Sequence, residues 1–349
     1  MRTAARVPQH PLDVEKGVGK AEQQQGRSPL AEACGVSAVL LSGLCYAASS
    51  GCLTLLNKHA LDGFGFRAPN ALLCFQCVLT VILVKACEMM GLIKQLQPVK
   101  RDLVLVWLPV NLLFVGMIGS SFYALQNVGV GMVTVWKNLS NVVTAIGDIV
   151  IYKKSYNWPV WATLLIMLAS AMVGASTDVR FTWSGYGWQM ANCLFTSSYA
   201  LYLRSVMDKV AEHTTNKQRM DEFSMVFYNN LLSIPCIMIL MYIFGEYNAI
   251  ANPTNQAALH NPLFQLVAGL SGIIGFAISF SSLWFLSQTT ATIYSLVGAL
   301  NKIPVAIFGL VIFREPTNPK NLASIILGLL AGVMFVRAKQ QPQRATAIK

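Results

Sequence analysis

The sequence predicts an all-α, polytopic membrane protein in which ten transmembrane helices form two inverted five-helix repeats. Three observations support this fold class: the composition, the distribution of basic residues and an internal repeat. Of the 349 residues, 54% are hydrophobic and 12% are charged, and the mean hydropathy is +0.52. That balance is typical of a chain that crosses a bilayer several times, and it argues against a soluble domain.

Ten apolar segments divide the chain. A helix needs about 20 apolar residues to cross the hydrocarbon core. The predicted spans are residues 36–60, 70–91, 103–126, 129–152, 158–177, 183–206, 222–246, 262–286, 290–313 and 318–338. Residues 1–33 lack an apolar run and are expected to form a disordered cytosolic tail. Residues 34–339 are expected to form one transporter domain, followed by a second cytosolic tail at 340–349.

The basic residues predict the orientation of the chain. The net charge of +11 does not indicate nucleic-acid binding, because Lys and Arg lie in short loops and tails between the spans. Most of them fall on the side of the membrane that holds both tails. The opposite side holds only Arg67, Arg180, Arg314 and Lys320. Since the more positive side faces the cytosol, both termini are expected there.

An internal similarity relates the two halves of the domain. The segment that begins at Ile149 resembles the one that begins at Leu310, which gives repeats at about residues 36–177 and 183–338. Each repeat would hold five spans, and an odd number makes the two repeats insert with opposite topology. Transporters built this way hold their substrate near the membrane midplane, between the halves.

A polar notch interrupts the ninth predicted span, Ala291–Phe313. Lys302 lies near the centre of this span, with Asn301 beside it and Gly298 one turn earlier. A lone cation at the bilayer centre costs about 2.5–3.5 kcal/mol on insertion scales, so such a residue is expected to have a function. The repeat places Lys137 one helical turn from the position of Lys302. Both lysines are therefore expected to face one central space that suits an anion.

Two adjacent asparagines lie in the seventh span, in Phe227-Tyr228-Asn229-Asn230. An unpaired amide in hydrocarbon costs several kcal/mol, so both side chains need partners. One interpretation is hydrogen bonding between helices. The other is recognition of a base, since carboxamides can pair with both the donor and the acceptor edge of a purine.

Other polar residues in the spans have simpler interpretations. Lys58 and Lys85 lie near span ends, where their ammonium groups are expected to reach the lipid headgroups. Glu88 follows Lys85 by three residues and is expected to pair with it. Asp148 suits either a local structural contact or a role in gating or proton coupling.

Two motifs resemble those of a known family. Phe227-Tyr228-Asn229-Asn230 and Gly298-Ala299-Leu300-Asn301-Lys302 are similar to the FYNN and GALNK signatures of Golgi GDP-mannose transporters, which are nucleotide-sugar transporters with the drug/metabolite transporter fold. The resemblance runs from about Cys45 to Lys339, and the joint presence of both motifs in a ten-span chain is specific.

This resemblance implies a substrate, a cellular location and a set of contacts. The protein would be a secondary antiporter, not an enzyme, that imports GDP-mannose into the Golgi lumen in exchange for GMP, with no cofactor and no metal. The implied guanine contacts are Tyr228, Asn229, Asn230 and Ser279. The implied ribose and phosphate contacts are Asn301, Lys302 and Lys137, and the implied sugar contacts are Tyr46, Tyr294 and Gly298.

Three alternatives stay open at the level of sequence. The protein could carry other GDP-sugars, such as GDP-fucose, GDP-glucose or GDP-arabinose. It could export small metabolites with proton coupling, for which Asp148 and Glu88 are the candidate carboxylates. It could also be a scaffold whose polar residues serve only helix packing. Gly328 and Gly332 are suited either to the seam of a homodimer or to a contact within the chain.

Overall fold

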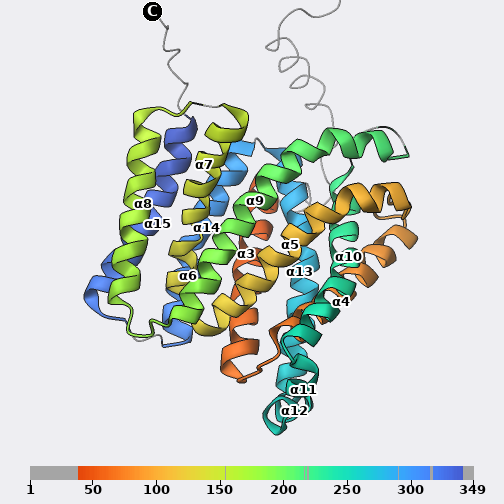
Figure 1. Cartoon of the computed structure of the whole chain (residues 1–349), viewed down its shortest axis with the longest axis horizontal. Helices are drawn as coiled ribbons and strands as arrows, with labels where there is room; N and C mark the ends of the chain where they lie inside the picture. The colour runs from red at the N-terminus through yellow and green to blue at the C-terminus, as the bar shows by residue number, and fades with distance from the viewer. Residues whose placement is uncertain are drawn as a thin grey trace, which may run out of the picture.

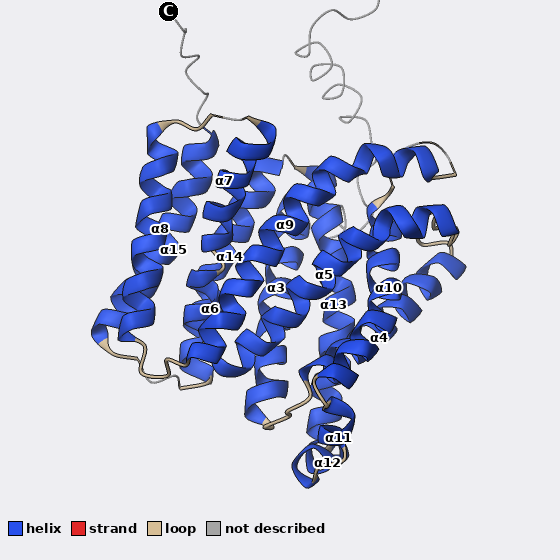
Figure 2. Ribbon diagram, in the orientation of Figure 1, coloured by secondary structure: helices blue, strands red, loops and turns tan. Residues whose placement is uncertain are grey.

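The computed structural model describes residues 38–153, 155–215, 217, 220–289, 291–314 and 317–340. Within these residues the backbone is helical apart from short connections, and no strand occurs (Figure 2). The all-α prediction is therefore confirmed for the described part of the chain. The two predicted tails lie almost wholly outside it.

The helices follow the predicted spans closely. They are α3 (Ala38–Lys58) with its π-helical extension η2 (His59–Gly63), α4 (Pro69–Met89), α5 (Arg101–Asn127), α6 (Val130–Trp136), α7 (Leu139–Tyr152), α8 (Trp158–Thr177), α9 (Trp183–His213), α10 (Glu222–Ile243), α11 (Glu246–Ile250), α12 (Pro253–His260), α13 (Pro262–Gln288), α14 (Ala291–Ile312) and α15 (Pro319–Gln340).

Seven helices in the described part of the chain are long and apolar enough to cross a membrane. They are α3 with η2, α4, α5, α8, α10, α13 and α15. The other three predicted spans differ for separate reasons. The fourth is broken into α6 and α7, whereas α9 and α14 are continuous helices of 31 and 22 residues in which some side chains lie outside the described part of the structure. The structure thus supports a polytopic membrane protein, and the count of ten spans stays a prediction.

Five of the helix pairs that pack together connect the two predicted repeats. α8 packs against α15, α5 against α9, α3 against α13, α4 against α10, and α6 against α14. In Figure 1 the α8–α15 pair lies at one side of the bundle and α4 with α10 at the other. The short helices α11 and α12 extend past one end of the bundle. Every pair joins one helix from each predicted repeat, so the core is built from both halves of the chain.

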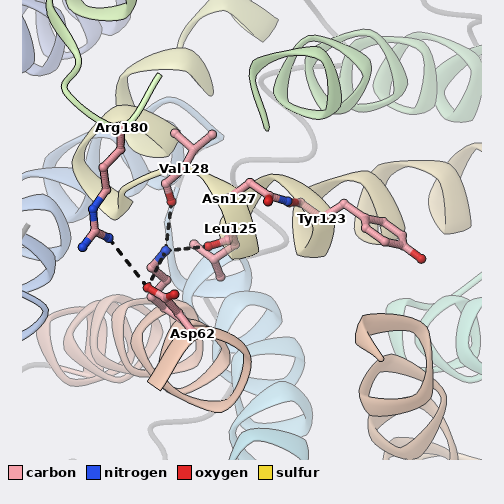
Figure 3. Close-up of polar contacts among 7 residues, drawn as sticks. Asp62, Tyr123, Leu125, Asn127, Val128 and Arg180 are labelled. Atoms are coloured by element: carbon pink, nitrogen blue, oxygen red, sulfur yellow. Dashed lines mark hydrogen bonds and ion pairs between the residues drawn. The ribbon is translucent and has the colours of Figure 1, made fainter. Parts of the chain in front are cut away.

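Lys58 is buried, which corrects the expectation that it reaches the headgroups. Its side chain is 1% exposed, and its ammonium donates to the carbonyls of Leu125 (2.8 Å) and Val128 (3.1 Å) at the end of α5. Asp62 lies 3.2 Å from the same ammonium, and Arg180 approaches Asp62 at 3.9 Å (Figure 3). The last carbonyls of a helix lack partners within the helix and carry partial negative charge, so they are a favourable site for a cation.

Glu246 caps the start of α4 with a negative charge, whereas Lys58 caps the end of α5 with a positive charge. Its side chain accepts from the backbone N–H groups of Asn70 (3.2 Å) and Ala71 (3.0 Å), from the Asn70 amide (2.9 Å) and from the Tyr123 hydroxyl (2.7 Å). The residue before α4, Ala68, cannot cap these donors with its own side chain. A carboxylate from the distant helix α11 therefore caps α4 and ties the two halves together. Burial raises the pKa of Glu246 above its ordinary value.

A first prediction concerns the Lys58 contacts. Lys58→Met is expected to destabilise the folded protein by about 1.5–3 kcal/mol, because two buried carbonyls lose a charged donor. Arg180→Met is the control and is expected to cost less than about 1 kcal/mol, since its contact with Asp62 is long and exposed. Denaturation in detergent measures both variants. Equal losses of stability in the two variants would show that the buried Lys58 ammonium stabilises the fold no more than the exposed Arg180 contact does.

A second prediction concerns Glu246 and pH. Because the pKa of Glu246 is higher in the folded protein than in the unfolded chain, the folded state binds more protons between the two values. Stability is therefore expected to fall as pH rises from about 4.3, the ordinary glutamate value, through the raised pKa, and then to level off. Glu246→Gln should flatten this dependence. Melting curves recorded from acid to neutral pH give the comparison, and parallel curves for the two proteins would contradict the assignment.

Candidate functional site

The Lys302 ammonium points to the break in the fourth predicted span. Between α6 and α7 the backbone turns at Lys137 and Asn138. The Lys302 ammonium donates to Asn138 Oδ1 at 2.7 Å, so the cation is held by a neutral amide rather than by a carboxylate. Helices that break inside a membrane commonly supply ligands for substrates, because their ends leave backbone dipoles unpaired. The polar notch and the broken helix thus form one site.

Lys137 lies at the same place from the other repeat. It forms the C-cap of α6, is half-buried, and directly precedes Asn138, the residue that accepts from the Lys302 ammonium. The meeting of the two lysine side chains in one central space stays a prediction. Two positive charges in a region of low dielectric constant repel each other strongly, and an anion between them would relieve that repulsion.

Two of the three sugar residues implied by the resemblance, Tyr46 and Gly298, lie next to each other. Tyr46 lies on α3 with its hydroxyl against Gly298 of α14, where an added Cβ would approach it to 3.2 Å. One turn along α3, Gly51 faces Asn301: a Cβ there would lie 3.9 Å from the Asn301 side-chain oxygen. Because Gly51 and Gly298 have no side chains, α3 and α14 approach closely, and Tyr46 and Asn301 lie at the same interface. Tyr294 belongs to the same helix, but its side chain lies outside the described part of the structure.

The two adjacent asparagines have different surroundings. Asn229 is buried. Its side-chain oxygen accepts from the Trp107 indole (2.9 Å) on α5, and its side-chain amide nitrogen donates to the Tyr199 hydroxyl (3.1 Å) on α9. These contacts agree with the interpretation of hydrogen bonding between helices. Asn230 is half-buried, and its amide donates to Val226 one turn back on its own helix (2.8 Å). Among the described residues no donor is found for the side-chain oxygen of Asn230, so this residue is the better placed of the two for a ligand.

The remaining predicted guanine residues lie on α10 and α13. The Tyr228 hydroxyl donates to the carbonyl of Pro98 at 2.6 Å, and its ring is fully buried. Ser279 is half-buried on α13 and donates to Gly275 in its own helix. No contact among the described residues links this group to Lys302. The proposed guanine and phosphate sites therefore remain two separate groups of residues in this structure.

Asn138 and two buried polar groups near it were not identified from the sequence. Asn138 is 1% exposed and also donates to the carbonyl of Gly328 on α15 (3.0 Å). Next to it, the indole N–H of Trp136 and the side-chain oxygen of Gln189 are buried without a hydrogen-bond partner among the described residues. Each such group costs about 1–3 kcal/mol. The signal in the sequence was an amide directly after Lys137 in the middle of an apolar span.

The other polar residues singled out in the sequence make local contacts. Asp148 is buried and accepts from the Tyr156 hydroxyl at 2.6 Å. Glu88 pairs with Lys85 at 2.7 Å, as expected. Gly328 packs against Val135 and Ser170, and Gly332 packs against Asn138. The two glycines thus serve packing within the chain, and a homodimer would need a different surface.

Comparisons with known proteins identify the family of the chain. The chain matches the Triose-phosphate Transporter family over residues 36–336. It is 46% identical to a protein of Arabidopsis thaliana named GDP-mannose transporter GONST1, over 86% of this chain and 89% of the relative. It is 32% identical to a protein of Aspergillus terreus named GDP-mannose transporter, over 86% of this chain and 80% of the relative.

A solved crystal structure shares the fold at 15% identity. Its TM-score is 0.50, and the alignment covers 86% of this chain and 97% of the other. That likeness concerns the fold alone. The family match, in contrast, extends over nearly all of the helical domain and over both motifs that surround Lys302 and Asn230. The chain therefore belongs to the Triose-phosphate Transporter family.

Proposed function

We propose that this protein carries GDP-mannose into the Golgi lumen in exchange for GMP, by alternating access between two inverted halves. The observation that carries the proposal is the Lys302 ammonium, held near Lys137 by a neutral amide in the middle of the bundle. Relatives of 46% and 32% identity are named GDP-mannose transporters, which gives the anion a chemical identity. The Golgi location follows from the resemblance of the two motifs.

The helix pairs support inverted repeats. If each predicted span is exchanged for its counterpart in the other repeat, the pairs α4–α10, α6–α14 and α8–α15 map onto themselves. The pairs α3–α13 and α5–α9 map onto each other. The whole set of pairs is thus unchanged by the exchange, as an approximate two-fold axis in the membrane plane requires. Both termini then face the same side, which the basic residues assign to the cytosol.

The buried charge gives a reason for exchange. Moving a bare cation through a region of low dielectric constant is unfavourable, so the empty carrier should reorient slowly. A nucleotide brings phosphate charges that compensate Lys302 and Lys137 and permit the movement. GMP, the product that remains after mannose transfer and cleavage of GDP, would complete the cycle in the opposite direction.

Asn230 is assigned as the guanine contact because of the hydrogen-bond donors that guanine presents. Guanine presents N1–H and N2–H₂ donors beside its O6 acceptor, and the Asn230 carbonyl oxygen can accept from such donors. Asn229 supports its neighbour through Trp107 and Tyr199. Uracil lacks this donor pair, so a UDP-sugar would leave polar groups unpaired in the pocket. Competition by GDP-fucose and GDP-glucose would show whether the carrier also accepts other GDP-sugars.

A third prediction tests the exchange. Proteoliposomes loaded with GMP are expected to take up labelled GDP-mannose at least about ten-fold faster than empty ones, because the uncompensated cation hinders return. Lys302→Ala should reduce uptake to background. Lys320→Ala, an exposed lysine at the start of α15, is the matched control and should transport normally. Equal uptake by loaded and empty vesicles would refute the charge argument, and uptake that requires a pH gradient would favour a proton-coupled exporter.

A fourth prediction separates the two asparagines by thermal stability. GMP should raise the melting temperature of the detergent-solubilised protein and UMP should not, since only a ligand that binds the folded state stabilises it. Asn230→Ala should reduce the GMP shift with little change in the ligand-free melting temperature. Asn229→Ala should lower the ligand-free melting temperature, because the Trp107 indole loses its buried partner. Equal stabilisation by GMP and UMP would remove the base-reading role, and no stabilisation by any nucleotide would favour a scaffold.

A further inference from the structure

Asn138 has a geometry that fixes the orientation of its side chain. Its oxygen accepts from the Lys302 ammonium at 2.7 Å, and its amide donates to the carbonyl of Gly328 at 3.0 Å. Reversing the carboxamide would place N–H₂ against the ammonium and oxygen against a carbonyl. Both contacts would then be repulsive. The acceptor is thus directed at Lys302 by the Gly328 carbonyl of α15, which lies 3.0 Å from the amide nitrogen of a side chain that is 1% exposed.

The neighbouring residues hold this amide in place. At Gly332, an added Cβ would approach the Asn138 amide nitrogen to 3.0 Å, so a larger residue would press on it. Asn138 also stands where α6 ends and α7 begins, and it therefore follows any movement of either helix. It belongs to the first repeat, whereas Lys302 and Gly328 belong to the second. The contact is a link between the halves that are proposed to move.

We propose that Asn138 is a positioning residue that substitutes for the phosphate at Lys302 when no nucleotide is bound. This inference rests on the proposed exchange function. The amide dipole stabilises the ammonium but does not cancel its charge, whereas a phosphate does both. A neutral residue therefore keeps Lys302 oriented in the empty carrier and still leaves it available to the nucleotide. A carboxylate at this position would compete with the phosphate.

The replacement Asn138→Asp tests this idea with a side chain of nearly the same size. The new carboxylate would pair with Lys302, so the empty carrier could reorient and GMP would no longer be required. Uptake into empty vesicles should then approach the uptake into GMP-loaded ones, and the KM for GDP-mannose should rise by about ten-fold or more, as expected for a lost charge-assisted contact. A purely structural Asn138 would reduce both uptakes and leave their ratio unchanged.

Asn321→Asp is the matched control. Asn321 is buried on α15 and its amide donates to a backbone carbonyl, that of Gly174, at 2.8 Å, as Asn138 donates to Gly328. The substitution therefore introduces the same charge and removes the same kind of bond without a lysine contact. It is expected to lower stability while the ratio of loaded to empty uptake stays as in the unmodified protein. A changed ratio in Asn321→Asp as well would overturn the inference.

A double-mutant cycle tests the contact without any transport. Asn138→Ala, Lys302→Met and the double variant are compared by their melting temperatures in detergent. Direct contact predicts that the effects of the single changes are not additive. Additive effects would overturn the inference. If the unmodified protein shows no exchange of GDP-mannose for GMP, the proposed function fails even where the cycle shows coupling. If exchange is present but Asn138→Asp keeps its requirement for GMP, the positioning role alone fails.

Discussion

The structure depends on one unusual contact, a lysine ammonium in the middle of a membrane domain that is bound by an amide. Lys302 reaches across from α14 to Asn138 at the break between α6 and α7. A carboxylate at that place would make a permanent ion pair, and an apolar residue would leave a charge that destabilises the fold. An amide lies between these extremes. It stabilises the Lys302 ammonium enough for folding, and the positive charge of the ammonium remains to be neutralised by the substrate.

One end of the bundle shows how the same chemistry is used for stability instead. Lys58 is buried more completely than Lys302, but it has a carboxylate and two helix-terminal carbonyls as partners. Glu246 is likewise satisfied by four donors at the start of α4. Around the α6–α7 break, in contrast, Trp136 and Gln189 keep polar atoms without partners among the described residues. The buried charges of Lys58 and Glu246 are thus paired, and the incompletely satisfied region lies beside the proposed substrate site, where a second conformation would be expected to rearrange contacts.

Hydrophobicity and motif spacing predicted much of this arrangement, and contacts between distant residues escaped them. Apolar runs located the helices because each span must satisfy its backbone within itself. The repeat predicts that Lys137 faces the same space as Lys302, and in the structure Lys137 directly precedes Asn138, which accepts from the Lys302 ammonium. Sequence could not place Lys58, since its burial depends on where α5 ends. It also could not distinguish Asn229, whose partners come from α5 and α9, from Asn230, which bonds within its own helix. Asn138 was missed because a single amide in an apolar run has no periodic signal; only the break in the helix and the contact with Lys302 show its importance.

The most direct test is a structure determined with GMP bound. The account predicts that the Lys302 ammonium leaves Asn138 Oδ1 and lies within hydrogen-bonding distance of a phosphate oxygen, with Lys137 on the same anion and the guanine against Asn230. A nucleotide bound elsewhere, with the Lys302–Asn138 contact still at 2.7 Å, would contradict it.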